Sequence, residues 1–118
     1  VRPVVSLDAV RELIAFARGV YVSEPVERYI VELVHATRVH PDVRLGASPR
    51  ATLQLVRASK ARAALDGRDF VLPDDVDALL LPVLAHRVVP TRSAAGRSGV
   101  AAVEELLLGI RAAVPVPR

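Results

Sequence analysis

Apolar residues recur at helical spacing in separate stretches along this 118-residue chain, and this period constrains its fold more than any other feature. Such spacing gathers apolar side chains on one face of an α-helix. A chain of this length suffices for one domain with its own core. The pattern therefore predicts a single all-α domain over 1–118, a compact bundle of about five helices with at most one very short β-ribbon.

Capping residues and helix breakers set the expected bounds of the helices. The expected helices run from Ser6 to Gly19, from Ser23 to before Pro41, from Ser48 to about Leu65, from Pro73 to Arg87, and from about Ser98 to Pro115. Two short β-prone pieces, 20–22 and 70–71, are candidates to pair with each other. The polar stretch 89–99 is rich in turn-forming residues and is predicted to be a flexible loop.

The apolar positions of each helix also predict which side chains form the core. The expected inward faces are Leu7, Val10, Leu13, Ile14 and Ala17 in the first helix, Val26, Ile30, Leu33, Val34 and Thr37 in the second, Leu55, Ala58, Ala61 and Leu65 in the third, and Val103, Leu106, Leu107 and Ile110 in the last.

The composition excludes several classes of protein. Cysteine is absent, which removes disulfide scaffolds, thiolate metal sites and cysteine nucleophiles. Aromatic residues are only 3%, too few for the base-stacking platforms of many nucleic-acid-binding modules. The longest apolar run, 78–85, contains Pro82 and is too short for a membrane span. The net charge of +3 is modest for a partner of nucleic acid, and the lack of any methionine indicates a piece of a longer protein.

Few residue groups in the sequence suit a catalytic or metal site. No glycine-rich stretch ends in the Gly-Lys-Ser/Thr of a phosphate-binding loop. Glu32 and His35 share a helix face, but two ligands are too few for a metal. The acidic residues Asp74, Asp75 and Asp77 suit the positive end of a helix dipole better than a cation site. We therefore expect no metal site.

The segment from Gly46 to Ala51 is more informative. Ser48 is a good N-cap and Pro49 suits the first helical position, so Arg50 falls in the first turn. Its guanidinium and the first-turn N–H groups would then point the same way and could bind an anionic oxygen, above all a phosphate. An ordinary surface arginine beside a cap explains the pattern equally well, and the local pattern alone does not choose between them.

The wider sequence resembles a known family. The run Leu45-Gly46-Ala47-Ser48-Pro49-Arg50-Ala51 resembles the sensor-2 motif of MoxR-type AAA+ ATPases. The resemblance extends over most of the chain, through the runs 29–34, 37–38, 60–63, 67–71, 73–76 and 83–87. Two positions depart from the family pattern. Leu72 stands where the family often has a threonine cap, and Phe70 replaces a tyrosine.

The resemblance implies a C-terminal lid domain, cut from the ATPase core that holds ATP and Mg²⁺. It assigns nucleotide binding to Ser48, Pro49 and Arg50, with Arg50 as the catalytic sensor-2 arginine that contacts the γ-phosphate. The isolated chain would not be an enzyme. The parent would hydrolyse ATP in the cytoplasm, as a hexameric ring that remodels or matures proteins. Expected partners are its own core, neighbouring subunits and von Willebrand factor A-domain proteins.

Two other functions remain open from the residues. Arg50, Arg57 and Lys60 lie roughly along one stripe of the third helix, which a small helical nucleic-acid-binding domain would use. The acidic residues of neighbouring helices and the scarcity of aromatics argue against it. A pure assembly module, whose apolar faces bind partner helices, is the second alternative.

Overall fold

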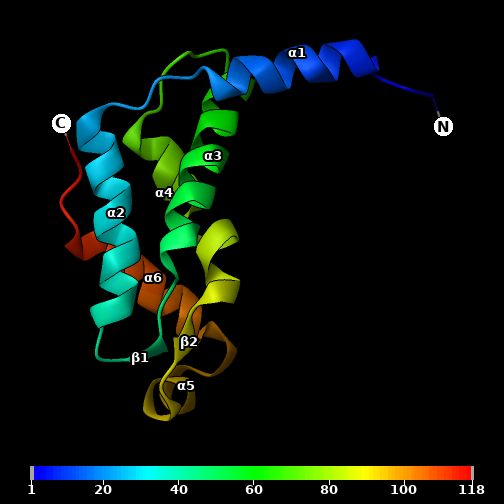
Figure 1. The fold of residues 1–118 in the computed structure, drawn as a ribbon. Coiled ribbons are helices and arrows are strands. Elements are labelled where there is room, and N and C mark those ends of the chain that lie inside the picture. The colour runs from blue at the N-terminus through cyan, green and yellow to red at the C-terminus, as the bar shows by residue number, and fades with distance from the viewer. Residues whose placement is uncertain (1, 118) are drawn as a thin grey trace.

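Helices account for most of the chain in the computed structural model, which describes residues 2–117 and, at Val100, the backbone alone (Figure 1). Within this range it contains six α-helices and one two-stranded ribbon. In chain order the elements are α1 (Leu7–Arg18), α2 (Glu24–Val39), β1 (Val43–Leu45), α3 (Pro49–Leu65), α4 (Pro73–Leu84), a 3-10 turn (Ala85–Arg87), β2 (Val89–Pro90), α5 (Arg92–Ser98), a second 3-10 turn (Gly99–Ala101) and α6 (Ala102–Ala113).

The central element is α3, which contacts α1, α2 and α4. Helix α6 crosses the bundle and packs against α2 and α4 (Figure 1). Helix α1 projects from one end of this bundle, while the ribbon and α5 lie at the opposite end. The largest fully buried apolar side chains, which form the centre of the core, are Tyr29, Ile30, Leu33, Leu55, Val76, Leu80, Leu84 and Leu107. The all-α prediction with one short ribbon is confirmed.

The predicted core face of α2 is confirmed, and that of α3 is partly wrong. Every expected position of α2 is buried. In α3, Leu55 is fully buried, but Leu65 is 76% exposed. The buried positions of α3 instead advance four residues at a time from Ala51 to Ala63, with Ala64 beside them, and α3 packs most extensively against α4.

The predicted core role of α1 is wrong. Its bounds are as expected, and the Ser6 hydroxyl caps it by accepting the N–H of Ala9 at 3.1 Å. None of its residues is buried, although its sequence is amphipathic. Helical spacing shows that a helix has an apolar face, but it does not show which element covers that face. Among residues 2–117, α1 contacts the bundle mainly through α3.

The ribbon forms in a different place from the one expected. Strand β1 pairs antiparallel with β2, with Val43 opposite Pro90 and Leu45 opposite Val89. The expected pieces do meet, through one parallel bridge between Tyr21 and Phe70. Two backbone hydrogen bonds hold this bridge, but it does not extend into strands.

The stretch 89–99 has more regular structure than predicted. It contains β2 and the helix α5. Thr91 starts this helix, since its hydroxyl accepts the N–H of Ala94 at 3.2 Å. An ion pair of 3.1 Å between Arg97 and Asp42 ties α5 to the start of β1. The flexibility of 89–99 stays a prediction.

Candidate functional site

The start of α3 has the geometry that the sequence predicted. Ser48 has the extended backbone of an N-cap, Pro49 is the first helical residue and Arg50 the second. The Ser48 hydroxyl makes no capping hydrogen bond, in contrast to the expectation that it caps the helix. Arg50 is exposed, and within residues 2–117 no carboxylate pairs with it. An exposed, unpaired arginine in the first turn can therefore receive an anion from outside the domain.

The loop before Arg50 is held by the end of α2. A Cβ atom on Gly46 would lie 2.5 Å from the carbonyl oxygen of Thr37, so only glycine fits this close approach. The next residue, Ala47, is fully buried and donates its N–H to the Thr37 hydroxyl at 3.0 Å. That hydroxyl in turn donates to the Val34 carbonyl at 2.7 Å. These contacts fix the position from which Arg50 projects.

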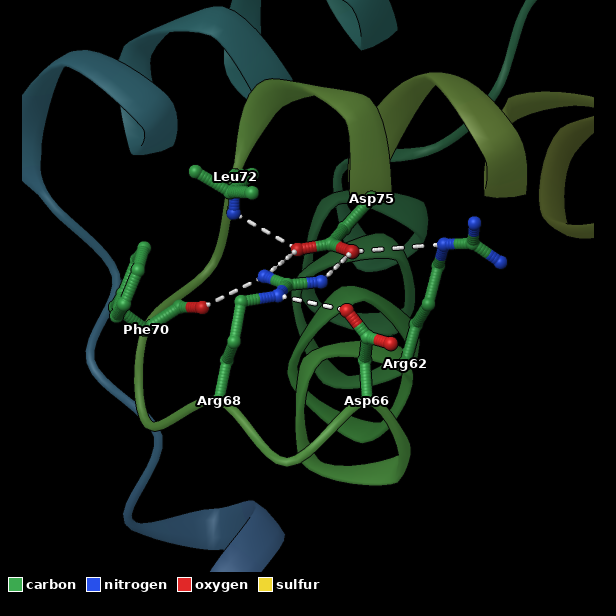
Figure 2. A network of polar contacts seen from close by, with 6 residues as sticks. All are labelled: Arg62, Asp66, Arg68, Phe70, Leu72 and Asp75. Carbon is green, nitrogen blue, oxygen red and sulfur yellow. Dashed lines mark hydrogen bonds and ion pairs between the residues drawn. The ribbon is translucent and has the colours of Figure 1, made fainter.

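A second polar cluster lies at the opposite end of α3 and was not predicted (Figure 2). Helix α3 ends at Leu65, and two residues later Gly67 has a φ of 75°, which favours glycine. Arg68 then donates two hydrogen bonds to the carboxylate of Asp75, at 2.6 and 2.8 Å. Asp75 also accepts the N–H of Leu72 at 2.8 Å, which caps α4. The cluster therefore joins the end of α3 to the start of α4.

The Asp75 side chain is only 2% exposed, so its charge needs these partners. Burial by itself opposes its ionisation, but the hydrogen bonds from Arg68 and Leu72 outweigh burial and lower the pKa of Asp75. Arg62 lies 3.5 Å from the same carboxylate and adds to this effect. The hydrogen bonds to Asp75 and to Asp66 raise the pKa of Arg68.

The three acidic residues near the start of α4 have different roles, which corrects the prediction that all serve the helix dipole. Asp74 is exposed in the first turn, as expected. Asp75 is the buried partner of Arg68. Asp77 accepts the hydroxyl of Tyr29 at 2.5 Å, and burial together with this bond raises the pKa of Tyr29. The signal for Asp75 was its position three residues after the helix N-cap, where a carboxylate can reach back to the cap N–H.

The described residues hold no group of three or more potential metal ligands close together. No helix among them combines the length and apolarity that crossing a membrane requires.

Comparisons with known proteins show the family of this chain. The model of the AAA lid domain family matches residues 35–106. The uncharacterised protein YeaC of Bacillus subtilis is 39% identical over 103 residues, 86% of this chain and 32% of YeaC. Protein MoxR of Paracoccus denitrificans is 37% identical over 112 residues, 84% of this chain and 33% of that protein. Chaperone MoxR1 of Mycobacterium tuberculosis is 34% identical over 102 residues, 79% of this chain and 27% of that protein.

A solved structure has the same fold. The crystal structure of a candidate ATPase from Cytophaga hutchinsonii superposes with a TM-score of 0.89 and 31% identity, over 99% of this chain and 38% of the other. The chain belongs to the AAA lid domain family, as a lid domain of the MoxR type. It spans about a third of the length of the curated relatives it matches.

Proposed function

We propose that this domain is the nucleotide-sensing lid of a MoxR-type AAA+ ATPase, with Arg50 as its sensor-2 arginine. The observation that supports this most is the placement of Arg50. It is exposed in the first turn of α3, and its loop is fixed by Gly46 and by the hydrogen bond from Ala47 to Thr37. An arginine on a fixed loop, with no carboxylate partner within residues 2–117, suits an anion held by another domain.

The chemistry of phosphoryl transfer explains why one arginine would matter. The reaction needs positioning and charge stabilisation, so a guanidinium on the γ-phosphate oxygens lowers the barrier as charge develops. Ser48 and Pro49 start the helix that aims Arg50, and the Ser48 hydroxyl, which makes no capping hydrogen bond, can donate to the same anion. ATP and Mg²⁺ would be held mainly by the rest of the parent protein. The lid alone would not hydrolyse ATP.

The wider role is proposed from the family. The parent would assemble as a hexameric ring in the cytoplasm and use the lid to couple ATP hydrolysis to remodelling or maturation of other proteins. The chaperone name of the Mycobacterium tuberculosis relative is consistent with this role. Proteins with von Willebrand factor A domains are the proposed partners. A nucleic-acid-binding function is not favoured by any of the comparisons.

The test is Arg50→Ala in the full-length parent, measured as ATP turnover at saturating ATP. Turnover should fall roughly 10- to 1,000-fold, which corresponds to about 1.4–4 kcal/mol of lost transition-state stabilisation. Arg50→Lys should restore it only in part, because an ammonium lacks the planar fork of a guanidinium. The matched control is Arg92→Ala, another exposed arginine in the first turn of a helix. Wild-type turnover by Arg50→Ala would refute the assignment.

A further inference from the structure

A groove of about 660 Å³ lies between α1 and α3, away from the start of α3. Its lining residues are Ile14, Ala17 and Arg18 from α1, and Arg57, Lys60 and Ala61 from α3. Cationic and apolar side chains therefore line the same surface, and none of the six is acidic. Lys60 donates a hydrogen bond of 2.6 Å to the carbonyl oxygen of Arg18, which ties the two helices together.

The three cations of the groove lack an acidic partner. Throughout the part of the chain that the structure describes, no carboxylate forms an ion pair with Arg18, Arg57 or Lys60. Arg18 also stands at the negative end of the α1 dipole, which offsets its charge only in part. Three positive charges beside apolar atoms leave a surface that is complementary to carboxylates.

The apolar side chains beside the groove are also exposed to solvent. Ile14, which lines the groove, is 47% exposed; Leu13 and Val10 of the same helix, outside the groove lining, are 45% and 37% exposed. Helices of about 12 residues are marginal in water unless tertiary packing covers their apolar face. Helix α1 has 12 residues and buries none of them within this domain. Helix α1 therefore has little of the tertiary packing that stabilises a helix of this length, and its contacts are mainly with α3.

We propose that this groove is the docking surface for an acidic amphipathic segment from the remainder of the parent polypeptide. The cations select carboxylates, and the apolar side chains select a segment that alternates acidic with apolar residues. A phosphate-rich polymer would leave the apolar part uncovered. A parent as long as these relatives would have enough further residues to provide such a segment, since this chain corresponds to only 32% of YeaC and 33% of the Paracoccus protein. Docking at this groove involves neither Arg50, which does not line it, nor a nucleotide.

The single lysine of the chain gives a direct test. A carbodiimide joins an amine to a carboxylate in contact with it by an amide bond, with loss of water. We treat the dilute full-length parent with carbodiimide and map cross-links by mass spectrometry. The expected product links Lys60 to an Asp or Glu of the same polypeptide outside residues 1–118. No cross-link from Lys60, or links only to carboxylates within 1–118, would overturn the proposal. A link that forms only between copies would also overturn it, in favour of a second copy.

Variants of the parent then test the charge of the groove. Arg57→Glu should lower the yield of the Lys60 cross-link roughly tenfold, because it repels the acidic segment. Backbone amides of α1 should exchange with solvent roughly tenfold faster in the same variant. Arg92→Glu, a reversal on an exposed arginine of α5, should change neither measurement. Arg50→Ala should leave the cross-link intact, so failure of the nucleotide-sensing role is distinguished from failure of this one.

Discussion

Removing the carboxylate of Asp75 should destabilise the domain more than any other change to a charged residue at the α3–α4 junction. Asp75→Ala deletes the acceptor of two Arg68 hydrogen bonds and of the Leu72 N–H, all at 2.6–2.8 Å. The loss leaves the Leu72 N–H without its acceptor, and Arg68, whose side chain is 19% exposed, keeps only Asp66 and the Phe70 carbonyl as partners. Removing a buried carboxylate that accepts three such hydrogen bonds costs about 2–4 kcal/mol, less than breaking a fully buried ion pair. For a domain of this size that corresponds to a melting temperature lower by roughly 10–20 °C.

Thermal and urea unfolding, followed by circular dichroism, measure this loss. The control is Asp74→Ala, which removes an exposed carboxylate from the same helical turn and should change stability by less than about 1 kcal/mol. If the Asp75→Ala variant were as stable as Asp74→Ala, the pair of Arg68 and Asp75 would contribute nothing to the stability of the α3–α4 junction.

The same variant makes a prediction about pH. The folded-state pKa of Asp75 lies below its unfolded value of about 3.9, so its contribution is fully present above that pH. The contribution is lost as the pH falls through the folded-state pKa. The stability difference between wild type and Asp75→Ala should therefore be constant near neutral pH and shrink below about pH 4. A difference that stays constant down to acid unfolding would contradict the ionised state of Asp75.

Three further substitutions test the packing by the same unfolding measurements. Gly46→Ala places a Cβ atom 2.5 Å from the Thr37 carbonyl and should cost about 1–3 kcal/mol; a neutral result would mean that the loop before α3 yields easily. Ser59→Ala should be neutral or stabilising by up to about 1 kcal/mol, because its buried hydroxyl has no hydrogen-bond partner among residues 2–117, and a clear loss of stability would reveal one. Leu55→Ala should cost about 2–5 kcal/mol, whereas Leu65→Ala on the same helix should change little, and equal effects would show that the helix is wrongly phased.

Local signals predicted the helix bounds well because caps act within one turn. Ser6 and Ser23 were identified as caps from residue type alone, and both accept the expected backbone N–H groups. Thr91 is an equally good cap, but the turn-forming residues after it concealed the helix that it starts. The composition of 89–99 predicted a loop, whereas the single capping residue Thr91 favours a helix, and the structure has the helix.

Contacts between distant residues were harder to predict. The sequence gives no direct sign that Gly46 lies against Thr37, since this depends on how α2 and the loop meet in space. The bidentate pair of Arg68 with Asp75 needs the turn between α3 and α4 to bring them together. The place of Arg50 in the first turn of α3 was predictable because it depends on the local helix start, whereas the contacts of its loop with Thr37 were not. Its role as sensor is still a proposal.

The length of α3 gives the two ends of this helix a mechanical relationship. Its 17 residues span about 25 Å at the normal helical rise, with Arg50 at one end and the cluster of Arg68 and Asp75 at the other. A tilt of about 10° about the Arg50 end, within the range of known domain rotations, would move the far end by about 4 Å. The cluster at that end links α3 to α4, so α4 would share this displacement. A small tilt at the Arg50 end would thereby become a movement of several ångströms at the far end of α3, large enough to change the contacts of a neighbouring surface.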